Sequence, residues 1–234
     1  MEQIRKSAVL MKSAIDEQEM ALINQHTLRE LSADEVFTFK LAASNNQIDR
    51  DWERFTDAAL EKMAELYVGK PVIRNHDWKH GCQTARVYAA NVVAADGGVK
   101  QLILRCYMPR TEGNAETITA IESGVLRECS VSVIVKRVAC SVCGANQREA
   151  ICRHFPGRIY DGVTCHFDLD DVSDVYEVSL VAIPANADAG VVKAKRYGGA
   201  DPEPDSQSWQ DKALLELEKN RFVMEGQNNE TETD

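Results

Sequence analysis

Apolar and β-branched runs, separated by turn residues, dominate the middle of this chain. The segment 36–41, Val-Phe-Thr-Phe-Lys-Leu, has the aromatic and β-branched content that is typical of a core strand. The same pattern predicts further strands over 71–74, 85–95, 99–108, 129–138 and 175–183. Between two of them, Asp96-Gly97-Gly98 is a strong signal for a hairpin turn. The hydrophobic pattern therefore predicts a strand-rich domain.

Helical spacing of apolar residues interrupts this strand pattern twice. Over 56–67 the apolar side chains recur at helical intervals, Thr56 suits the N-cap position, and Gly69 suits the end. A second helix is predicted over 115–123, and Gly124 marks its stop. Many strands with few helices predict an α+β fold, in which a curved antiparallel sheet or β-barrel is flanked by a few helices.

The pattern also divides the chain into three parts. Residues 35–196 form the main domain. Residues 1–34 are polar and amphipathic and predict an N-terminal helical arm, near whose end Ser32 and Glu35 have the spacing of a capping box. Residues 197–234 begin with a Gly- and Pro-rich stretch and end in acidic residues, which predicts a flexible linker and a C-terminal tail.

Composition and charge narrow the class of protein. A chain of 234 residues with 44% hydrophobic residues is long enough for one sizeable globular domain. The formal net charge of -10 argues against a nucleic-acid partner, because phosphate backbones are bound mainly through Lys and Arg. No stretch approaches the roughly 20 apolar residues of a membrane-spanning helix, and residues 1–15 lack a signal-peptide core. We therefore expect a protein of the cytoplasm with no membrane partner.

The cysteines give the strongest local signal for a metal site. Of seven cysteines, four lie between Cys140 and Cys165, a crowding that in a reducing compartment indicates metal binding rather than disulfides. The series Cys140-x2-Cys143-x8-Cys152-x-His154 has the paired-ligand spacing of a zinc knuckle. These four residues are the predicted ligands, with the alternative that the cysteines are simply reduced and unligated.

Two further residues compete for the fourth ligand position, and the ligand types indicate the role of the metal. Cys165 and His166 are alternatives to His154. A Cys-rich set closes the coordination shell, whereas a catalytic zinc keeps a position open to water, so a structural Zn2+ is predicted. It would order an insertion over 139–168, between two of the predicted strands.

Four polar residues carry candidate chemistry. His76 follows a short apolar strand, where loops often carry function, although a lone histidine is more often structural. Strand alternation places Ser130 and Ser132 on one face, opposite a row of valines, and does not choose between them. Glu177 alternates with apolar neighbours, which by itself predicts a solvated strand residue.

Taken in order along 36–195, several segments resemble the prohead protease family of tailed bacteriophages, whose fold is similar to that of the herpesvirus assemblin proteases. They are residues 49–55 (Asp-Arg-Asp-Trp-Glu-Arg-Phe), 75–77 (Asn-His-Asp), the strand with Ser130, and 176–185 (Tyr-Glu-Val-Ser-Leu-Val-Ala-Ile-Pro-Ala). A Cys-rich insertion resembles one in a subgroup of these proteins.

This resemblance implies a serine endopeptidase of capsid maturation with a His-Ser-Glu triad. His76 matches the family's general base, Ser130 its nucleophile and Glu177 the acidic group that orients the histidine. Glycine is common at the position of Ser132, so the chain departs from the family there and Ser132 stays a second candidate. The mechanism implied is acyl transfer, with donors for the oxyanion left unassigned.

The resemblance also implies partners and a place of action. The enzyme would cleave segments of phage scaffold and major capsid proteins, and itself, during virion assembly, as a homo-oligomer inside the prohead in the bacterial cytoplasm. The alternative is a catalytically inactive head-assembly or scaffold-associated protein with a structural zinc site. A zinc-dependent hydrolase is disfavoured, because the chain has no His-Glu-x-x-His arrangement.

Overall fold

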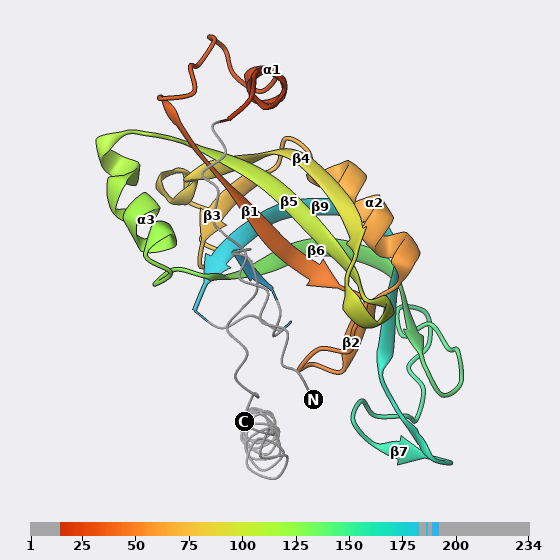
Figure 1. Ribbon diagram of the computed structural model, residues 1–234. Helices are drawn as coiled ribbons and strands as arrows, with labels where there is room; N and C mark the ends of the chain where they lie inside the picture. Colours follow the sequence, from red (N-terminus) through yellow and green to blue (C-terminus); the bar gives the residue numbers. More distant parts are fainter. Residues whose placement is uncertain (1–14, 183–185, 187–188, 192–234) are drawn as a thin grey trace, which may run out of the picture. The chain divides into compact units, whose positions relative to one another are not determined.

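A computed structural model describes residues 15–182, 186 and 189–191 of the chain (Figure 1). The predicted helical start of the arm before residue 15 and the predicted linker and tail over 197–234 lie outside the described residues. The helices are α1 (Glu17–Asn24), α2 (Asp57–Tyr67) and α3 (Glu112–Glu122). The strands are β1 (Val36–Asn45), β2 (Glu53–Phe55), β3 (Pro71–Arg74), β4 (Ala85–Ala94), β5 (Lys100–Pro109), β6 (Glu128–Cys140), β7 (Ile159–Tyr160), β8 (Val163–Thr164), β9 (Phe167–Val181) and β10 (Gly190–Val191).

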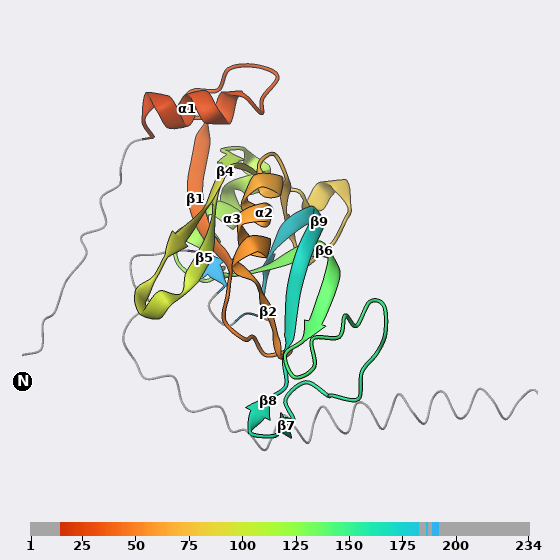
Figure 2. The ribbon, with the colours of Figure 1, turned by 90° about the vertical axis from the view of Figure 1, so that its right-hand side faces the viewer.

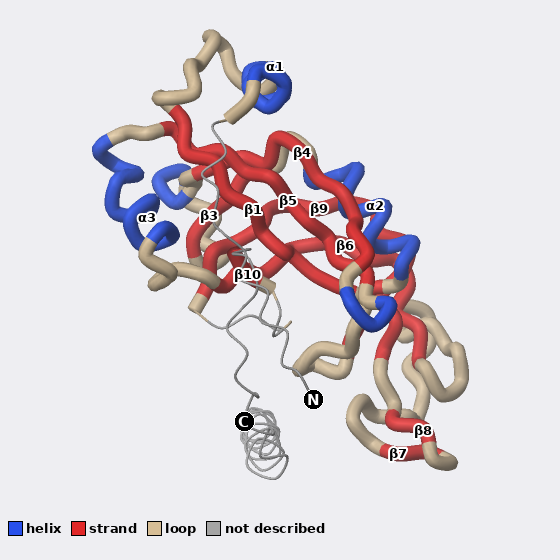
Figure 3. The backbone as a smooth tube through the Cα atoms, in the orientation of Figure 1, coloured by secondary structure: helices blue, strands red, loops and turns tan. Residues whose placement is uncertain are grey.

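A closed β-barrel is the centre of the described structure. The strands follow the order β2-β9-β3-β4-β5-β1-β10-β6, and a pairing of β6 with β9 closes the ring, leaving β2 attached to one end of β9. The predicted α+β class and the barrel are therefore confirmed. The pairings are antiparallel except those of β9 with β2 and with β3, which are parallel. The tube in Figure 3 shows the helices outside the ring of strands.

Helix α2 forms as its sequence predicts and packs into the main core. The Thr56 Oγ1 accepts a hydrogen bond of 3.1 Å from the backbone N–H of Ala59, which caps the first turn. One face of the helix is fully buried through Leu60, Met63 and Tyr67. Burying such side chains contributes roughly 1.5–3 kcal/mol each, so this face anchors the helix against the barrel.

In the described part of the predicted N-terminal arm, residues 15–34, the helix covers only Glu17–Asn24. Helix α1 ends at Asn24, whose side chain accepts a hydrogen bond from the Leu31 backbone N–H and stabilises the loop that follows. Ser32 and Glu35 do contact each other, as a capping box would require. However, β1 begins at the next residue, so this signal marks a turn before a strand and not a helix start. The pKa of Glu35 is lowered to about 2, mainly by the hydrogen bond from Arg29 and to a smaller extent by those from Ser32.

Strand β9 begins eight residues before the predicted start, and one bulge in it changes the environment of Glu177. In the ladder with β6, Ser132 lies opposite Glu177 and Val133 lies opposite Val175, so Tyr176 has no partner. Tyr176 consequently points outward and is 40% exposed, although alternation placed it on the apolar face. The prediction of a solvated Glu177 is wrong, because its residue is only 1% exposed.

The insertion between β6 and β9 forms a separate lobe that docks on the loop before β2. Figures 1 and 2 place its β7–β8 hairpin at the opposite end of the barrel from α1. The Trp52 carbonyl accepts a hydrogen bond of 2.9 Å from the Phe167 backbone N–H. The Trp52 indole lies against Gly157 so closely that a Cβ there would be 2.8 Å from Nε1. Gly157 also has a φ of +80°, a conformation that favours glycine.

Replacing Gly157 with alanine is therefore expected to lower the free energy of unfolding by about 2–4 kcal/mol, through the clash with Trp52 and the unfavourable backbone. Gly162 provides a matched control, because its φ is +82° and no atom lies within 4 Å of its Cβ position. Gly162→Ala should cost only about 1–2 kcal/mol. Urea denaturation followed by circular dichroism measures both. Equal losses would show that Trp52 moves aside without cost.

Candidate functional site

His76 lies in a tight turn directly after β3, held against the end of β9. Asn75 and His76 both have positive φ angles, of 52° and 53°, which non-glycine residues rarely adopt. Two hydrogen bonds hold this turn: the Asn75 N–H donates to the Leu180 carbonyl at 3.0 Å, and the His76 N–H donates to the Ser179 Oγ at 2.9 Å. Such conformations persist where the surrounding contacts determine them, and they occur often at functional sites.

A buried carboxylate orients the imidazole ring. The Glu177 Oε1 lies 2.8 Å from the His76 Nδ1, and the Glu177 side chain is only 2% exposed. Its other oxygen, Oε2, accepts a hydrogen bond of 2.7 Å from the Ser179 hydroxyl. Ser179 is fully buried and thus connects the backbone of His76 to the carboxylate that contacts its ring. With Nδ1 directed at Glu177, Nε2 is the ring atom that can exchange a proton with another group.

Ser132 joins this pair from the neighbouring strand. It lies opposite Glu177 in the β6–β9 ladder, and its hydroxyl donates a hydrogen bond to the Glu177 Oε1. The Ser132 Oγ is also 3.3 Å from the His76 Nδ1. The structure therefore brings together His76, Glu177 and Ser132, on the Nδ1 side of the ring.

Ser130 lies two residue pairs further along β6, opposite Ser179. It is on the same strand face as Ser132, while Val131 and Val133 pack against the core, as alternation predicted. Within the described part of the chain, the Ser130 hydroxyl makes no hydrogen bond, and none joins it to His76. Of the three residues assigned by resemblance, His76 and Glu177 are thus in direct contact, and Ser130 lies opposite Ser179, two positions along β6 from Ser132.

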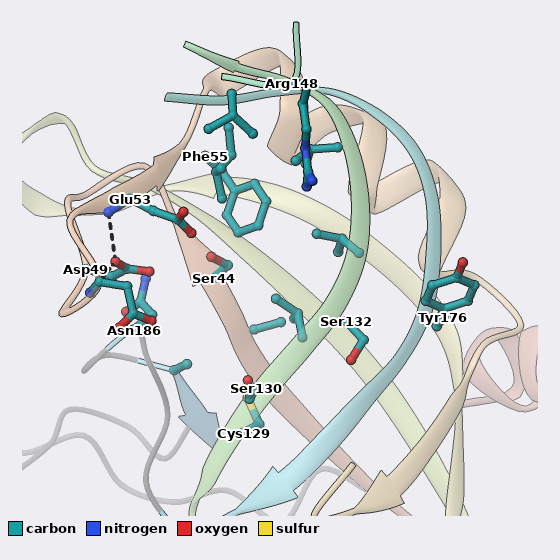
Figure 4. A pocket seen from close by; sticks show the side chains of 18 of the residues that line it. Ser44, Asp49, Glu53, Phe55, Cys129, Ser130, Ser132, Arg148, Tyr176 and Asn186 are labelled. Carbon is teal, nitrogen blue, oxygen red and sulfur yellow. Dashed lines mark hydrogen bonds between the residues drawn. The ribbon is translucent and has the colours of Figure 1, made fainter. Parts of the chain in front are cut away.

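A pocket of about 500 Å3 adjoins the two serines (Figure 4). Its wall includes both serines on the outer face of β6, and core-facing residues of the same strand such as Val131. The pocket therefore wraps around the edge of β6. At its other end lie Asp49 and Glu53, which come from the loop before β2 and from β2 itself.

Sequence reasoning missed two parts of this site. The role of Ser179 requires the His76 turn to fold over β9, and no local pattern announces that contact. The acidic end of the pocket lies within residues 49–55, which contribute to the family resemblance, but the sequence indicated no role for its carboxylates. Charge spacing alone could have marked Asp49, Asp51 and Glu53 as a cluster, although a solvated loop has the same pattern.

The predicted metal ligands converge in the insertion. One ligand atom from each of Cys140, Cys143, Cys152 and His154 lies within 4.8 Å of all the others. Tetrahedral coordination with metal–sulfur distances of about 2.3 Å requires ligand atoms roughly 3.5–4 Å apart. The Cys140 Sγ is 3.7 Å from the His154 Nδ1, which fits this requirement. These four residues could therefore hold a metal ion.

The backbone around Cys140 favours its thiolate form. Burial alone would raise the pKa of Cys140, but the backbone N–H groups of Cys143 and Val142 donate to its sulfur, and the pKa is lower than that of an ordinary thiol. Gly144 follows the pair with a φ of +72°, as the predicted turn requires. Only deprotonated cysteine is a metal ligand, so this turn is suited to metal binding.

Cys165, the alternative ligand, lies behind the cluster. Its Sγ is 3.9 Å from the Cys140 Sγ and its residue is fully buried. Burial, followed by the hydrogen bond with Cys140, raises the pKa of the Cys165 thiol to about 11. Cys165 is not part of the convergent group of four ligand atoms, so the geometry favours His154 for the fourth position.

Comparison with family models, curated proteins and solved structures found no match to this chain. The family resemblance consequently depends on the ordered sequence segments, and the site has to be judged by its own geometry. Among the described residues, no helix has the length and apolar content needed to cross a membrane.

Proposed function

We propose that this protein is a serine endopeptidase that works by acyl transfer. The observation that carries the proposal is the 2.8 Å contact between the His76 Nδ1 and the buried Glu177, beside a strand with two outward-facing serines. A histidine that acts as a general base needs a partner that fixes its tautomer and stabilises the imidazolium. Glu177 supplies both, because it is ionisable, fully enclosed and hydrogen-bonded on each oxygen.

Ser130 is the better candidate for the nucleophile. Ser132 contacts Nδ1 and the carboxylate, so it lies on the orienting side of the ring and serves to position Glu177. The attacking hydroxyl has to approach Nε2, and the Ser130 hydroxyl is uncommitted and lines the pocket. Hydrogen bonds of this kind are often long in a free enzyme and shorten when substrate binds.

The reaction then follows from these positions. The Ser130 oxygen attacks the scissile carbonyl while the His76 Nε2 takes its proton, and Glu177 stabilises the resulting imidazolium. The same proton passes to the leaving amine, and a water molecule repeats the sequence on the acyl-enzyme. Ser179 keeps the ring and the carboxylate in register throughout, since it contacts both His76 and Glu177.

The biological role rests on the resemblance to prohead proteases. The proposed substrates are segments of phage scaffold and major capsid proteins and the chain itself, cleaved during head assembly in the bacterial cytoplasm. A homo-oligomer within the prohead is part of the same proposal.

The metal we propose is a structural Zn2+. Three cysteines and one histidine would fill a tetrahedral shell and leave no position for water or substrate. Bound there, the ion would hold the ends of the insertion together and contribute to its folding, not to the chemical step.

Self-cleavage and active-site labelling test the enzyme directly. Purified protein is incubated alone, or with a serine-reactive fluorophosphonate, and fragments and labelled peptides are identified by mass spectrometry. We expect cleavage and a single label on Ser130, both lost in Ser130→Ala, with slower cleavage in Ser132→Ala. A label on Ser132 would reverse the two roles. Absence of any label, with identical fragments in wild type and Ser130→Ala, would favour the inactive head protein, a reading consistent with the missing Ser130–His76 hydrogen bond.

A further inference from the structure

Among the described strands, none pairs with one edge of β6 beside the two serines. The short strand β10 pairs with β6 only at Glu128, and the first residue past it, Cys129, still donates to the Ala189 carbonyl. Between Ser130 and Arg137, β6 pairs only with β9 among the described strands. The pocket opens along this edge, so a ligand in it reaches both the outer face with the serines and the core side of the strand.

The far end of the pocket is acidic and preorganised. The Asp49 Oδ1 accepts hydrogen bonds from the backbone N–H groups of Asp51 and Glu53, at 2.9 and 3.0 Å, which fixes the loop. In Figure 4 the Glu53 carboxylate extends into the pocket. It has no hydrogen bond or ion pair within the described residues. Burial raises the pKa of Glu53, and the charges of Asp49 and Asp51 raise it further. Within the described residues, this carboxylate therefore has no directly paired cation.

A largely buried serine beside these acids also presents its hydroxyl to the pocket. Ser44 is only 5% exposed, lines the pocket, and makes no side-chain hydrogen bond in the described structure. A register shift in β1 between Ala42 and Ser44 accompanies this orientation. The Ser44 oxygen is available to accept a hydrogen bond from an ammonium or guanidinium group in the pocket.

Arg148 is the cation that lines the same pocket, and it does not neutralise the acidic end. It comes from the insertion, forms no ion pair in the described structure, and has a smaller influence on the pKa of Glu53 than burial and the two aspartates. Three carboxylates thus face one guanidinium. Phe55 and Leu169 also line the pocket and give it apolar walls, against which the methylene groups of a long basic side chain can pack.

We propose that the pocket selects substrates with a lysine or arginine side chain, which Glu53 binds as an ion pair and Ser44 as a hydrogen-bond acceptor. This inference rests on the proposed peptidase function, because it places the basic residue close to the bond that Ser130 attacks. The basic side chain adds positive charge to that of Arg148 and supplies N–H donors to Glu53 and Ser44.

Positional peptide libraries, read by mass spectrometry, test the selectivity. We expect one position near the cleaved bond at which Lys or Arg raises kcat/KM about 10- to 100-fold over Gln or Leu. Glu53→Gln should remove this preference, and Ser44→Ala should weaken it. Glu61→Gln is the matched control, because Glu61 is an exposed residue of α2 outside the pocket. Cleavage without a basic preference, or a preference that survives in Glu53→Gln, would overturn the inference.

A binding measurement separates this inference from the peptidase function. Calorimetry with the Ser130→Ala variant compares matched peptides that carry Lys or Gln, and it needs no turnover. Tighter binding of the Lys peptide, lost when Glu53→Gln is added, supports the pocket even if the wild-type protein cleaves nothing. Equal binding of both peptides contradicts the pocket even if cleavage is observed.

Discussion

Substitution of Glu177 by glutamine is expected to lower kcat by about 10^4, the loss seen when a triad carboxylate becomes an amide. The amide has nearly the same shape, so Ser132 and Ser179 keep a polar partner and the barrel should stay folded. It carries no charge to stabilise the imidazolium, and its NH2 group favours the wrong tautomer at the His76 Nδ1. Peptide cleavage kinetics and thermal unfolding, measured together, separate the loss of activity from any loss of structure.

Asp174→Asn on the same strand is the control for this prediction. It also converts a carboxylate to an amide, but its side chain is 46% exposed and pairs with Lys70 away from the His76 turn. Activity should change little, because exposed ion pairs contribute roughly 0–1 kcal/mol. If Glu177→Gln keeps wild-type kcat, the carboxylate plays no part in the reaction and the proposed triad is wrong.

Removal of the metal is expected to have the second large effect. Structural zinc sites contribute about 10–16 kcal/mol of coupled folding and binding free energy in small domains. Chelation should therefore unfold residues 141–166 while the barrel persists, since the main core lies in the barrel strands and α2. Hydrogen exchange followed by mass spectrometry should show loss of protection in the insertion and retention in β4 and β5. Unchanged exchange in the insertion after complete removal of the metal would contradict the structural role.

Two cysteine variants identify the ligand set. Cys143→Ser should abolish binding of one Zn2+ per chain, because Cys143 belongs to the convergent group. Cys165→Ser should retain that zinc, because the Cys165 sulfur lies outside the group. Metal content by elemental analysis and the absorption of the Co2+ form measure both. If Cys165→Ser loses the metal and His154→Ala retains it, the fourth ligand is Cys165.

The parts of the fold that sequence predicted well depend on local interactions. Thr56 caps α2 through a contact three residues away, and Asp96-Gly97-Gly98 closes the β4–β5 hairpin between adjacent strands. The four metal ligands likewise lie within fifteen positions of one another. In each case the residues that determine the structure are neighbours in the chain, so their pattern is visible in the sequence.

The environment of Glu177 could not be predicted in this way. Its burial depends on His76, which is 101 positions away, and on Ser132, which is 45 positions away. The bulge at Tyr176 also changes which residues share a strand face, and strict alternation does not anticipate a bulge. For Ser32 and Glu35 the local contact was predicted correctly, but its structural context was not. The spacing suggested a helix cap, whereas the strand β1 begins at the next residue.

Because Trp52 packs closely on Gly157, the wild-type protein contains an intrinsic fluorescent probe at this contact. The chain has three tryptophans, and the Trp52 indole lies at the contact between the insertion and the loop before β2. An indole changes its emission when water reaches it. Separation of the insertion from this loop would thus be visible as a change in intrinsic fluorescence, without any label or substitution.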